Sequence, residues 1–214
     1  MEHSELGIMK ALVDIFHHDR GSRQEFLDYA LSTAISQTGS VYGYIYFYSE
    51  ETQQFELNTW SRGVMESCSV IEPQTRYQLS KTGIWGEAVR QRKPIIVNDF
   101  EAENPLKKGY PQGHVHLTRF MTIPIISGDT IVAVVGVANK KTEYTESDVT
   151  RLSLLMDAVW KVTSLRTAEQ ELKKSNELLS QKDLIFNLFL EHSPVYVFFK
   201  DEQMRSLYLS RNFE

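Results

Sequence analysis

Cys68, His114 and His116 are the residues of this 214-residue chain whose types and positions best suit ligand chemistry. A cysteine thiolate and an imidazole are both good ligands for a metal ion or for haem iron. The two histidines lie in residues 99–119, a stretch without a clear hydrophobic period that also holds two prolines and two glycines. A loop of this length inside a compact domain is usually functional. Cys68, His114 and His116 are therefore candidate ligand- or cofactor-binding residues.

Simpler roles are open for each of these three residues. Free cysteine is among the most buried residue types, so Cys68 also suits a position in the core. The histidines also suit a solvated loop that bonds its own backbone. A zinc site is a weaker alternative, because a structural zinc site needs about four ligands. The loop offers only acidic residues as additional ligands, and these are more often solvated: Asp99, Glu101 and Glu103.

Hydrophobic periodicity indicates an α+β domain. Apolar residues at helical spacing predict helices over residues 4–18 and 22–37, with Ser22 as N-cap and Gly39 ending the second helix. Alternating and aromatic-rich segments predict strands at residues 41–48, 55–60, within 70–79, and at 94–98, 121–126 and 131–138, with a short helix over 82–92. This order favours an antiparallel sheet with helices packed on one face.

A long helix follows, from residue 146 to about residue 187. Leu165, Leu172, Leu179 and Phe186 recur every seven residues, as in a coiled coil. The companion positions are weak, because they hold Ala168, Ser175 and Lys182. We favour a parallel dimer helix with a marginal seam, and a solvated linker helix is the alternative. After Pro194, two further short strands are predicted within residues 195–209.

Four ordered blocks resemble the GAF domains of bacterial and archaeal sensor histidine kinases. They are the segments at residues 82–90 (TGIWGEAVR), 94–99 (PIIVND), 104–110 (NPLKKGY) and 136–140 (GVANK). The resemblance covers roughly residues 4–162, and residues 184–214 resemble the start of a PAS domain. It implies three parts: a GAF sensory domain at residues 1–162, a signalling helix at 163–187 and a truncated PAS domain at 188–214. The chain stops before that last domain is complete, so we expect the natural protein to continue.

The resemblance also implies a function. A ligand pocket would lie on the sheet face opposite the helices, and the chain would form a homodimer through its helices. Its signal would pass to a downstream kinase or response regulator. Some GAF domains of methanogen sensor kinases hold haem through one thioether cysteine and an axial histidine, and Cys68 and His114 resemble that pair in position. Haem tethered through Cys68, with His114 as axial ligand, is therefore one candidate cofactor, and the ligand is otherwise unknown.

Other motifs have structural interpretations. Trp85 could line the pocket, although core packing is the more common role of a large aromatic residue. Arg90 lies at the end of the short helix, where its charge suits the helix dipole. The family's cyclic-nucleotide signature is only partly present around Asn139, Lys140 and Asp148, so we interpret these residues as scaffold.

Composition excludes several classes of protein. The formal net charge is −5, which disfavours nucleic-acid binding. No apolar stretch is long enough to span a bilayer and the amino terminus does not resemble a signal peptide, so we expect a cytoplasmic module. Membrane association of the parent protein through other segments stays open. No catalytic motif is found, and we expect a ligand- or redox-sensing module of a two-component sensor kinase rather than an enzyme. The alternatives are a structural dimerisation module and a GAF-fold methionine sulfoxide reductase, which would normally need more than one cysteine.

Overall fold

The computed structural model describes residues 2–18, 21–61, 75–107, 115–192, 194 and 196–209. The chain divides into two compact units, Met1–Thr163 and Ser164–Glu214. The helix that links them, α5 (Glu146–His192), contributes its first turns to the first unit and the rest to the second. Each unit is described by itself below.

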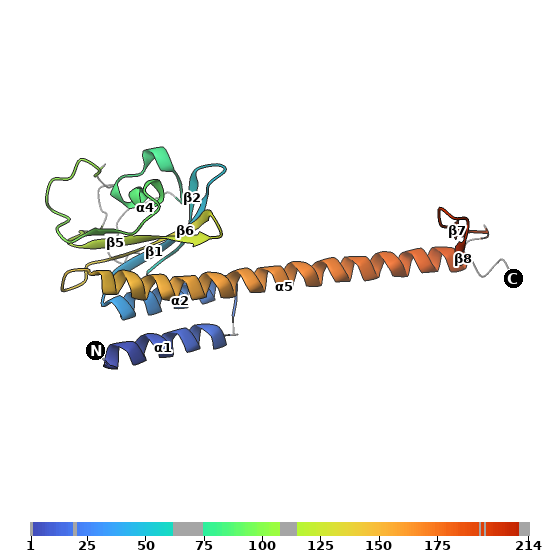
Figure 1. The fold of residues 1–214 in the computed structure, drawn as a ribbon, viewed down its shortest axis with the longest axis horizontal. Coiled ribbons are helices and arrows are strands. Elements are labelled where there is room, and N and C mark those ends of the chain that lie inside the picture. The colour runs from blue at the N-terminus through green and yellow to red at the C-terminus, as the bar shows by residue number, and fades with distance from the viewer. Residues whose placement is uncertain are drawn as a thin grey trace. The chain divides into compact units, whose positions relative to one another are not determined.

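A six-stranded sheet forms the centre of the first unit (Figure 1). Its strand order is β3-β2-β1-β6-β5-β4, and each neighbouring pair is antiparallel. The strands are β1 (Tyr42–Ser49), β2 (Gln54–Trp60), β3 (Arg76–Gln78), β4 (Ile95–Val97), β5 (Phe120–Ser127) and β6 (Thr130–Ala138). The predicted α+β class, with an antiparallel sheet, is confirmed.

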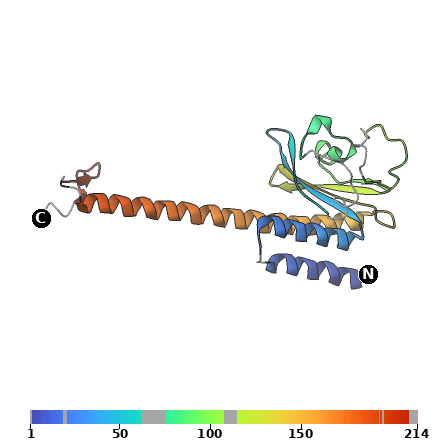
Figure 2. The same cartoon turned by 180° about the vertical axis from the view of Figure 1, so that it is seen from behind.

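Helices cover one face of this sheet. The helices are α1 (Glu2–His17), α2 (Arg23–Thr38) and the first turns of α5, and both cartoon views place them on the side opposite α4 (Figures 1 and 2). α2 begins where predicted, because the Ser22 side chain accepts a hydrogen bond from the Glu25 N–H and the Glu25 carboxylate accepts one from the Ser22 N–H. It ends at Gly39, whose φ of 64° is the left-handed conformation that glycine adopts at low cost.

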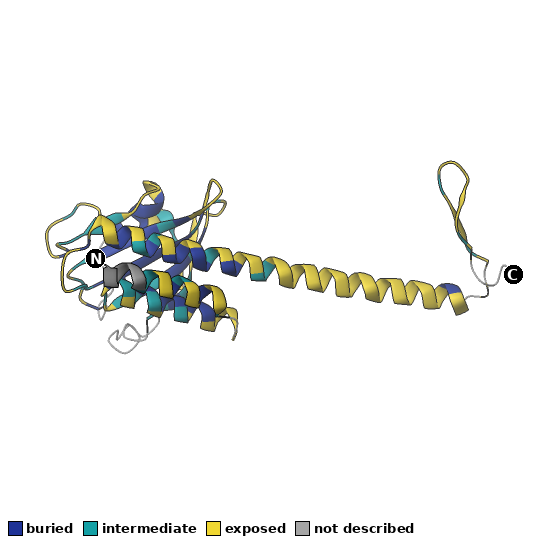
Figure 3. Ribbon diagram, turned by 60° about the horizontal axis from the view of Figure 1, so that its bottom comes forward, coloured by how far each residue is buried: buried dark blue, intermediate teal, exposed yellow. Residues whose placement is uncertain are grey.

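Successive side chains along each strand point to opposite faces of the sheet, so the buried residues are divided between the two faces. Ile45, Ile123 and Val135 point toward the helices and form one core with apolar residues of α2 and α5. Their neighbours in sequence point to the opposite face, as expected for a period of two. Figure 3 shows the buried positions concentrated on the sheet and on the sides of the helices that face it.

A short segment lies over the second face of the sheet. It contains two 3₁₀ turns, η1 (Leu79–Lys81) and η2 (Ile84–Gly86), followed by α4 (Glu87–Arg90). The predicted helix over residues 82–92 was therefore too long. Gly83 and Gly86 explain the difference, because glycine weakens a helix. A Cβ on Gly86 would lie 1.9 Å from the Thr82 hydroxyl oxygen, so the turn is tighter than a regular helix with larger side chains allows.

The start of α5 is fixed by a buried ion pair. Lys140 Nζ lies 2.7 Å from both carboxylate oxygens of Asp148, and Asp148 also accepts hydrogen bonds from the N–H and hydroxyl of Thr145. Burial by itself would raise the pKa of Asp148, but the Lys140 and Thr145 contacts outweigh it and hold that pKa below its usual value. Lys140 and Asp148 thus act as scaffold, as the sequence suggested.

The second unit contains the remainder of α5 and a hairpin. The hairpin pairs β7 (Phe198–Lys200) with β8 (Ser206–Leu209). β7 is shorter than the strand predicted at residues 195–201, whereas β8 has the predicted bounds, 206–209. The seven-residue seam of α5 is exposed in the single chain: the exposed fractions are 62% for Leu165, 63% for Leu172 and 59% for Leu179. Most of this part of α5 is exposed on every side (Figure 3).

Candidate functional site

The sheet face opposite α1, α2 and α5 is lined by aromatic rings, and we call it the aromatic face. Tyr44 of β1 forms its floor. Tyr44 pairs with Gly136 of β6, which in turn pairs with Thr122 of β5. The Tyr44 hydroxyl donates a 3.2 Å hydrogen bond to the Thr122 hydroxyl, so its side chain reaches across β6.

Gly136 is required for this arrangement. A Cβ at Gly136 would lie 2.3 Å from the Tyr44 ring, closer than any real Cβ contact. The ring therefore rests directly on the backbone of β6. Burial raises the pKa of Tyr44 far above its ordinary value, so the phenol keeps its proton and stays a hydrogen-bond donor.

Trp85 of η2 lies over the aromatic face and is half-buried. Its ring centroid is 4.7 Å from that of Phe55, 5.3 Å from Tyr46, 5.6 Å from Tyr77 and 6.2 Å from Tyr44. These separations are typical of favourable aromatic pairs. Trp85 thus packs where two apolar clusters of this face meet, one around Phe55 and one around Phe120. This packing fits the core-packing interpretation of Trp85, and a contact with a ligand stays a prediction.

Arg90 fastens the segment that carries Trp85. Its guanidinium donates to the carbonyls of Leu79, Thr82 and Gly83, at 2.9, 2.9 and 3.0 Å, and to the Thr82 hydroxyl at 3.1 Å. It also pairs with the buried Glu87 carboxylate at 2.6 Å. Arg90 lies in the last turn of α4, as the sequence predicted, and its side chain also folds back on the preceding turns and satisfies their carbonyl groups.

His116 lies at the surface. Its Nε2 is 3.0 Å from a Glu101 carboxylate oxygen, and both side chains are about two-thirds exposed, at 65% and 68%. The preceding residue, Val115, is buried. Asn139 fastens this end of the loop, because its side chain accepts from the Thr118 N–H and donates to the His116 carbonyl. The structure does not bring the His116 imidazole onto the aromatic face.

Cys68 and His114 lie outside the described residues, so their predicted roles are untested. Among the residues that the structure does describe, no group of three or more histidine, cysteine, aspartate and glutamate side chains could hold a metal ion. Nor does any helix in that part of the chain have the length and apolar character needed to cross a membrane.

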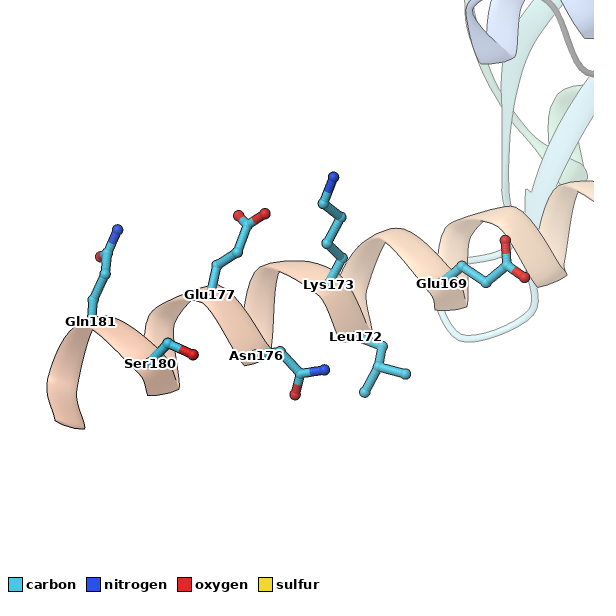
Figure 4. A pocket seen from close by; sticks show the side chains of 7 residues that line it. All are labelled: Glu169, Leu172, Lys173, Asn176, Glu177, Ser180 and Gln181. Carbon is cyan, nitrogen blue, oxygen red and sulfur yellow. The ribbon is translucent and has the colours of Figure 1, made fainter. Parts of the chain in front are cut away.

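Two hollows in the part of the chain that the structure describes lie away from the aromatic face. One is a space of about 10 Å³ between the sheet and the helices, next to Ile45, Phe47, Met156 and Trp160. It has room for one water molecule at most. The other is bounded by residues of α5 alone, and their side chains point away from a single helix with no opposite wall (Figure 4). That hollow is helix surface rather than a closed site.

The sequence matches the model of the GAF domain family over residues 21–163. This match spans the sheet, α2 and the first turns of α5. The chain belongs to the GAF domain family. Because the four sequence blocks at residues 82–140 lie within the matched region, the resemblance to a GAF domain is confirmed. The link to a sensor histidine kinase and the PAS domain stay predictions.

One curated relative of this GAF chain is the methyl sulfide methyltransferase-associated sensor of Methanosarcina acetivorans. The two sequences are 43% identical over 190 residues, a region that covers 86% of this chain and 19% of the relative. The chain therefore spans about a fifth of the length of that sensor. What the whole relative does is not a property of this fragment by itself.

Solved GAF structures share the fold at low sequence identity. The GAF domain of a phosphoenolpyruvate-protein phosphotransferase from Coxiella burnetii has a TM-score of 0.62 at 13% identity, covering 77% of this chain and 98% of that one. A free methionine-R-sulfoxide reductase from Neisseria meningitidis has a TM-score of 0.57 at 14% identity, covering 77% and 91%. At these identities the likeness concerns the fold alone.

Sequence reasoning missed Tyr44, Gly136 and Arg90. Gly136 left one signal: it is a glycine inside a strand of β-branched residues, which often marks a close approach by another group. The sequence contains no signal for the contacts of Arg90, because its partners are backbone carbonyls that only the tight turns at Gly83 and Gly86 bring close.

Proposed function

We propose that this GAF domain is the ligand- or redox-sensing module of a two-component sensor histidine kinase. The family assignment and the relative's printed name, a sensor, support a sensory role. In this proposal the aromatic face is the ligand site, and α5 carries the signal toward downstream domains. The module acts in the cytoplasm.

The observation that carries the proposal is the shared sheet between the aromatic face and α5. Tyr44 forms the floor of the aromatic face, whereas Ile45, the next residue of β1, packs in the core with Leu155 and Met156 of α5. On β6, Gly136 lies under the Tyr44 ring, and Val135 packs in that same core. A ligand that shifts Tyr44 would therefore move strands that contact α5 directly. Close packing transmits such small shifts.

The exposed seam of α5 supports a dimeric output. Leu165, Leu172 and Leu179 are each more than half exposed in the single chain, and their spacing is that of one coiled-coil position. We propose that a second copy of this chain covers them. The companion positions, Ala168, Ser175 and Lys182, keep the seam weak, so two packings can differ little in free energy.

Crosslinking of α5 tests this relay. Single cysteines introduced at positions 165, 168, 172, 175 and 179 are joined with a short bismaleimide, with and without haemin, and the parent chain with Cys68 alone gives the background. The proposal predicts a seven-residue pattern of dimer crosslinks whose strongest positions change when haemin binds. An unchanged pattern in a chain shown to bind haemin would exclude a rearrangement of the seam.

The hairpin in the second unit supports a downstream domain. Phe198, Leu207 and Leu209 are each more than half exposed there, which is unusual for strand residues of a complete domain. We propose that residues 188–214 begin a PAS domain whose later strands cover these side chains. The partners of the full protein would then be its own kinase domain and a response regulator.

Haem is one candidate for the ligand. The described part of the aromatic face is apolar and built of flat rings, which suits a planar cofactor. The Cys68 thiol would tether haem through a thioether bond and the His114 imidazole would bind its iron. Bound haem would supply a redox- or gas-responsive iron. Tyr44, as the floor of the aromatic face, would contact its ring and exclude water.

A further inference from the structure

The Trp85 side chain lies at the centre of the aromatic face, although Trp85 itself is not part of the sheet. The indole belongs to the 3₁₀ turn η2, whereas three of its ring neighbours, Tyr44, Tyr46 and Phe55, belong to β1 and β2. Phe55 is fully buried and Tyr46 nearly so. Without the indole these rings would line an open, apolar depression with Tyr44 as its floor.

Within the part of the chain that the structure describes, ring packing is the contact that holds the Trp85 indole in place. Its contacts there are the four ring pairs with Phe55, Tyr46, Tyr77 and Tyr44, and no hydrogen bond from its N–H to a described residue is found. A buried tryptophan usually pairs its N–H. The polar anchor of the segment is Arg90, which donates hydrogen bonds to the carbonyls of Leu79, Thr82 and Gly83 rather than to the indole. The side chain can thus leave the face while the Arg90 contacts persist.

We propose that Trp85 is a displaceable plug that fills the ligand site until a ligand takes its place. The ligand is a planar, mostly apolar ring system of at least the size of indole, because it replaces an indole among the same aromatic walls. This inference rests on the proposed ligand-sensing function and adds a regulatory feature to it. Displacement of Trp85 moves η2 and couples ligand binding to the loop segment, in addition to the strands.

Removing Trp85 should change the ligand affinity in opposite directions, depending on whether Trp85 is a plug or a wall, that is, a residue that lines the bound ligand. If a side chain must leave before the ligand enters, only the open fraction of the molecules can bind. The apparent Kd is then the Kd of the open site divided by that fraction. A side chain that lines the bound ligand instead contributes to its affinity. The sign of the change in Kd on removing the indole therefore decides between the two roles.

The test uses 1-anilinonaphthalene-8-sulfonate, an aromatic probe with a flat naphthalene ring system, and its Kd is measured by calorimetry. Trp85→Ala is compared with the parent chain and with Trp160→Ala, which removes a half-buried tryptophan packed against Phe47 on the helix side. Cooperative thermal unfolding of each variant excludes probe binding by a loosened core. Trp85→Leu, which keeps an apolar side chain, serves if Trp85→Ala does not fold.

The plug predicts that Trp85→Ala binds the probe about tenfold more tightly than the parent chain. Trp85→Leu should lie between the two, and Trp160→Ala should match the parent. Equal or weaker binding by Trp85→Ala, when the parent chain binds, would show that Trp85 is a wall and would leave the sensor function intact. No saturable binding by any folded chain would overturn the plug and the ligand site together.

Discussion

Replacing Arg90 with methionine should lower the free energy of unfolding by about 3 kcal/mol. The substitution keeps the apolar part of the side chain but leaves the buried Glu87 carboxylate without its cation. It also leaves the carbonyls of Leu79, Thr82 and Gly83 without the guanidinium that they bond. Urea unfolding followed by circular dichroism measures the loss.

A matched substitution separates this effect from the loss of any arginine. Arg76 lies on β3 and pairs with Glu56 at 2.8 Å, but both side chains are mostly exposed, at 71% and 59%. Exposed ion pairs contribute little because water screens them. Arg76→Met should therefore change the free energy of unfolding far less than Arg90→Met. Equal losses in the two variants would contradict the role given to Arg90.

Gly136→Ala should lower the free energy of unfolding by about 2 kcal/mol, as overpacking of a close-packed site does. The added Cβ would lie 2.3 Å from the Tyr44 ring, and the nearest atoms belong to that ring. The ring must then move off β6, which breaks the hydrogen bond with Thr122. Because the floor of the aromatic face is displaced, ligand binding should fall as well.

A double-mutant cycle identifies the clash as the cause. In a Tyr44→Ala background the ring is absent, so the same Gly136→Ala change should cost much less than it does in the parent chain. The difference between the two costs is the interaction between positions 44 and 136. Additive effects would show that Gly136 matters for a reason other than the Tyr44 ring.

Local signals predicted much of the fold. The ends of α2 followed from Ser22 and Gly39, whose capping roles depend on neighbours in sequence. The core between the sheet and the helices could also be predicted. A hydrophobic period of two in a strand, or of 3.6 in a helix, places the apolar side chains on one side of that element, whatever element packs against it. The error at residues 82–92 has the same origin: local apolar residues suggested a helix, and the tight turns at Gly83 and Gly86 depend on contacts with Thr82 and Arg90.

The aromatic face was less accessible from the sequence. Tyr44, Tyr46 and Tyr48 were visible as an aromatic strand, but the pairing of Tyr44 with Gly136 depends on the register of β1 against β6. Reactive residue types drew attention to Cys68 and His114, which lie outside the described residues, and to His116, which pairs with Glu101 at the surface. Side-chain type predicts which chemistry is available, whereas only tertiary structure decides which side chains share a site.

The most direct test of a ligand site on the aromatic face is native mass spectrometry. The folded chain is weighed after purification with haem supplementation and, separately, after incubation with a small-molecule extract of its source cells. We predict one bound small molecule per chain, present in the parent and in Arg76→Met and strongly reduced in folded Gly136→Ala. A bare chain under every condition, or equal occupancy in Gly136→Ala, would contradict the account.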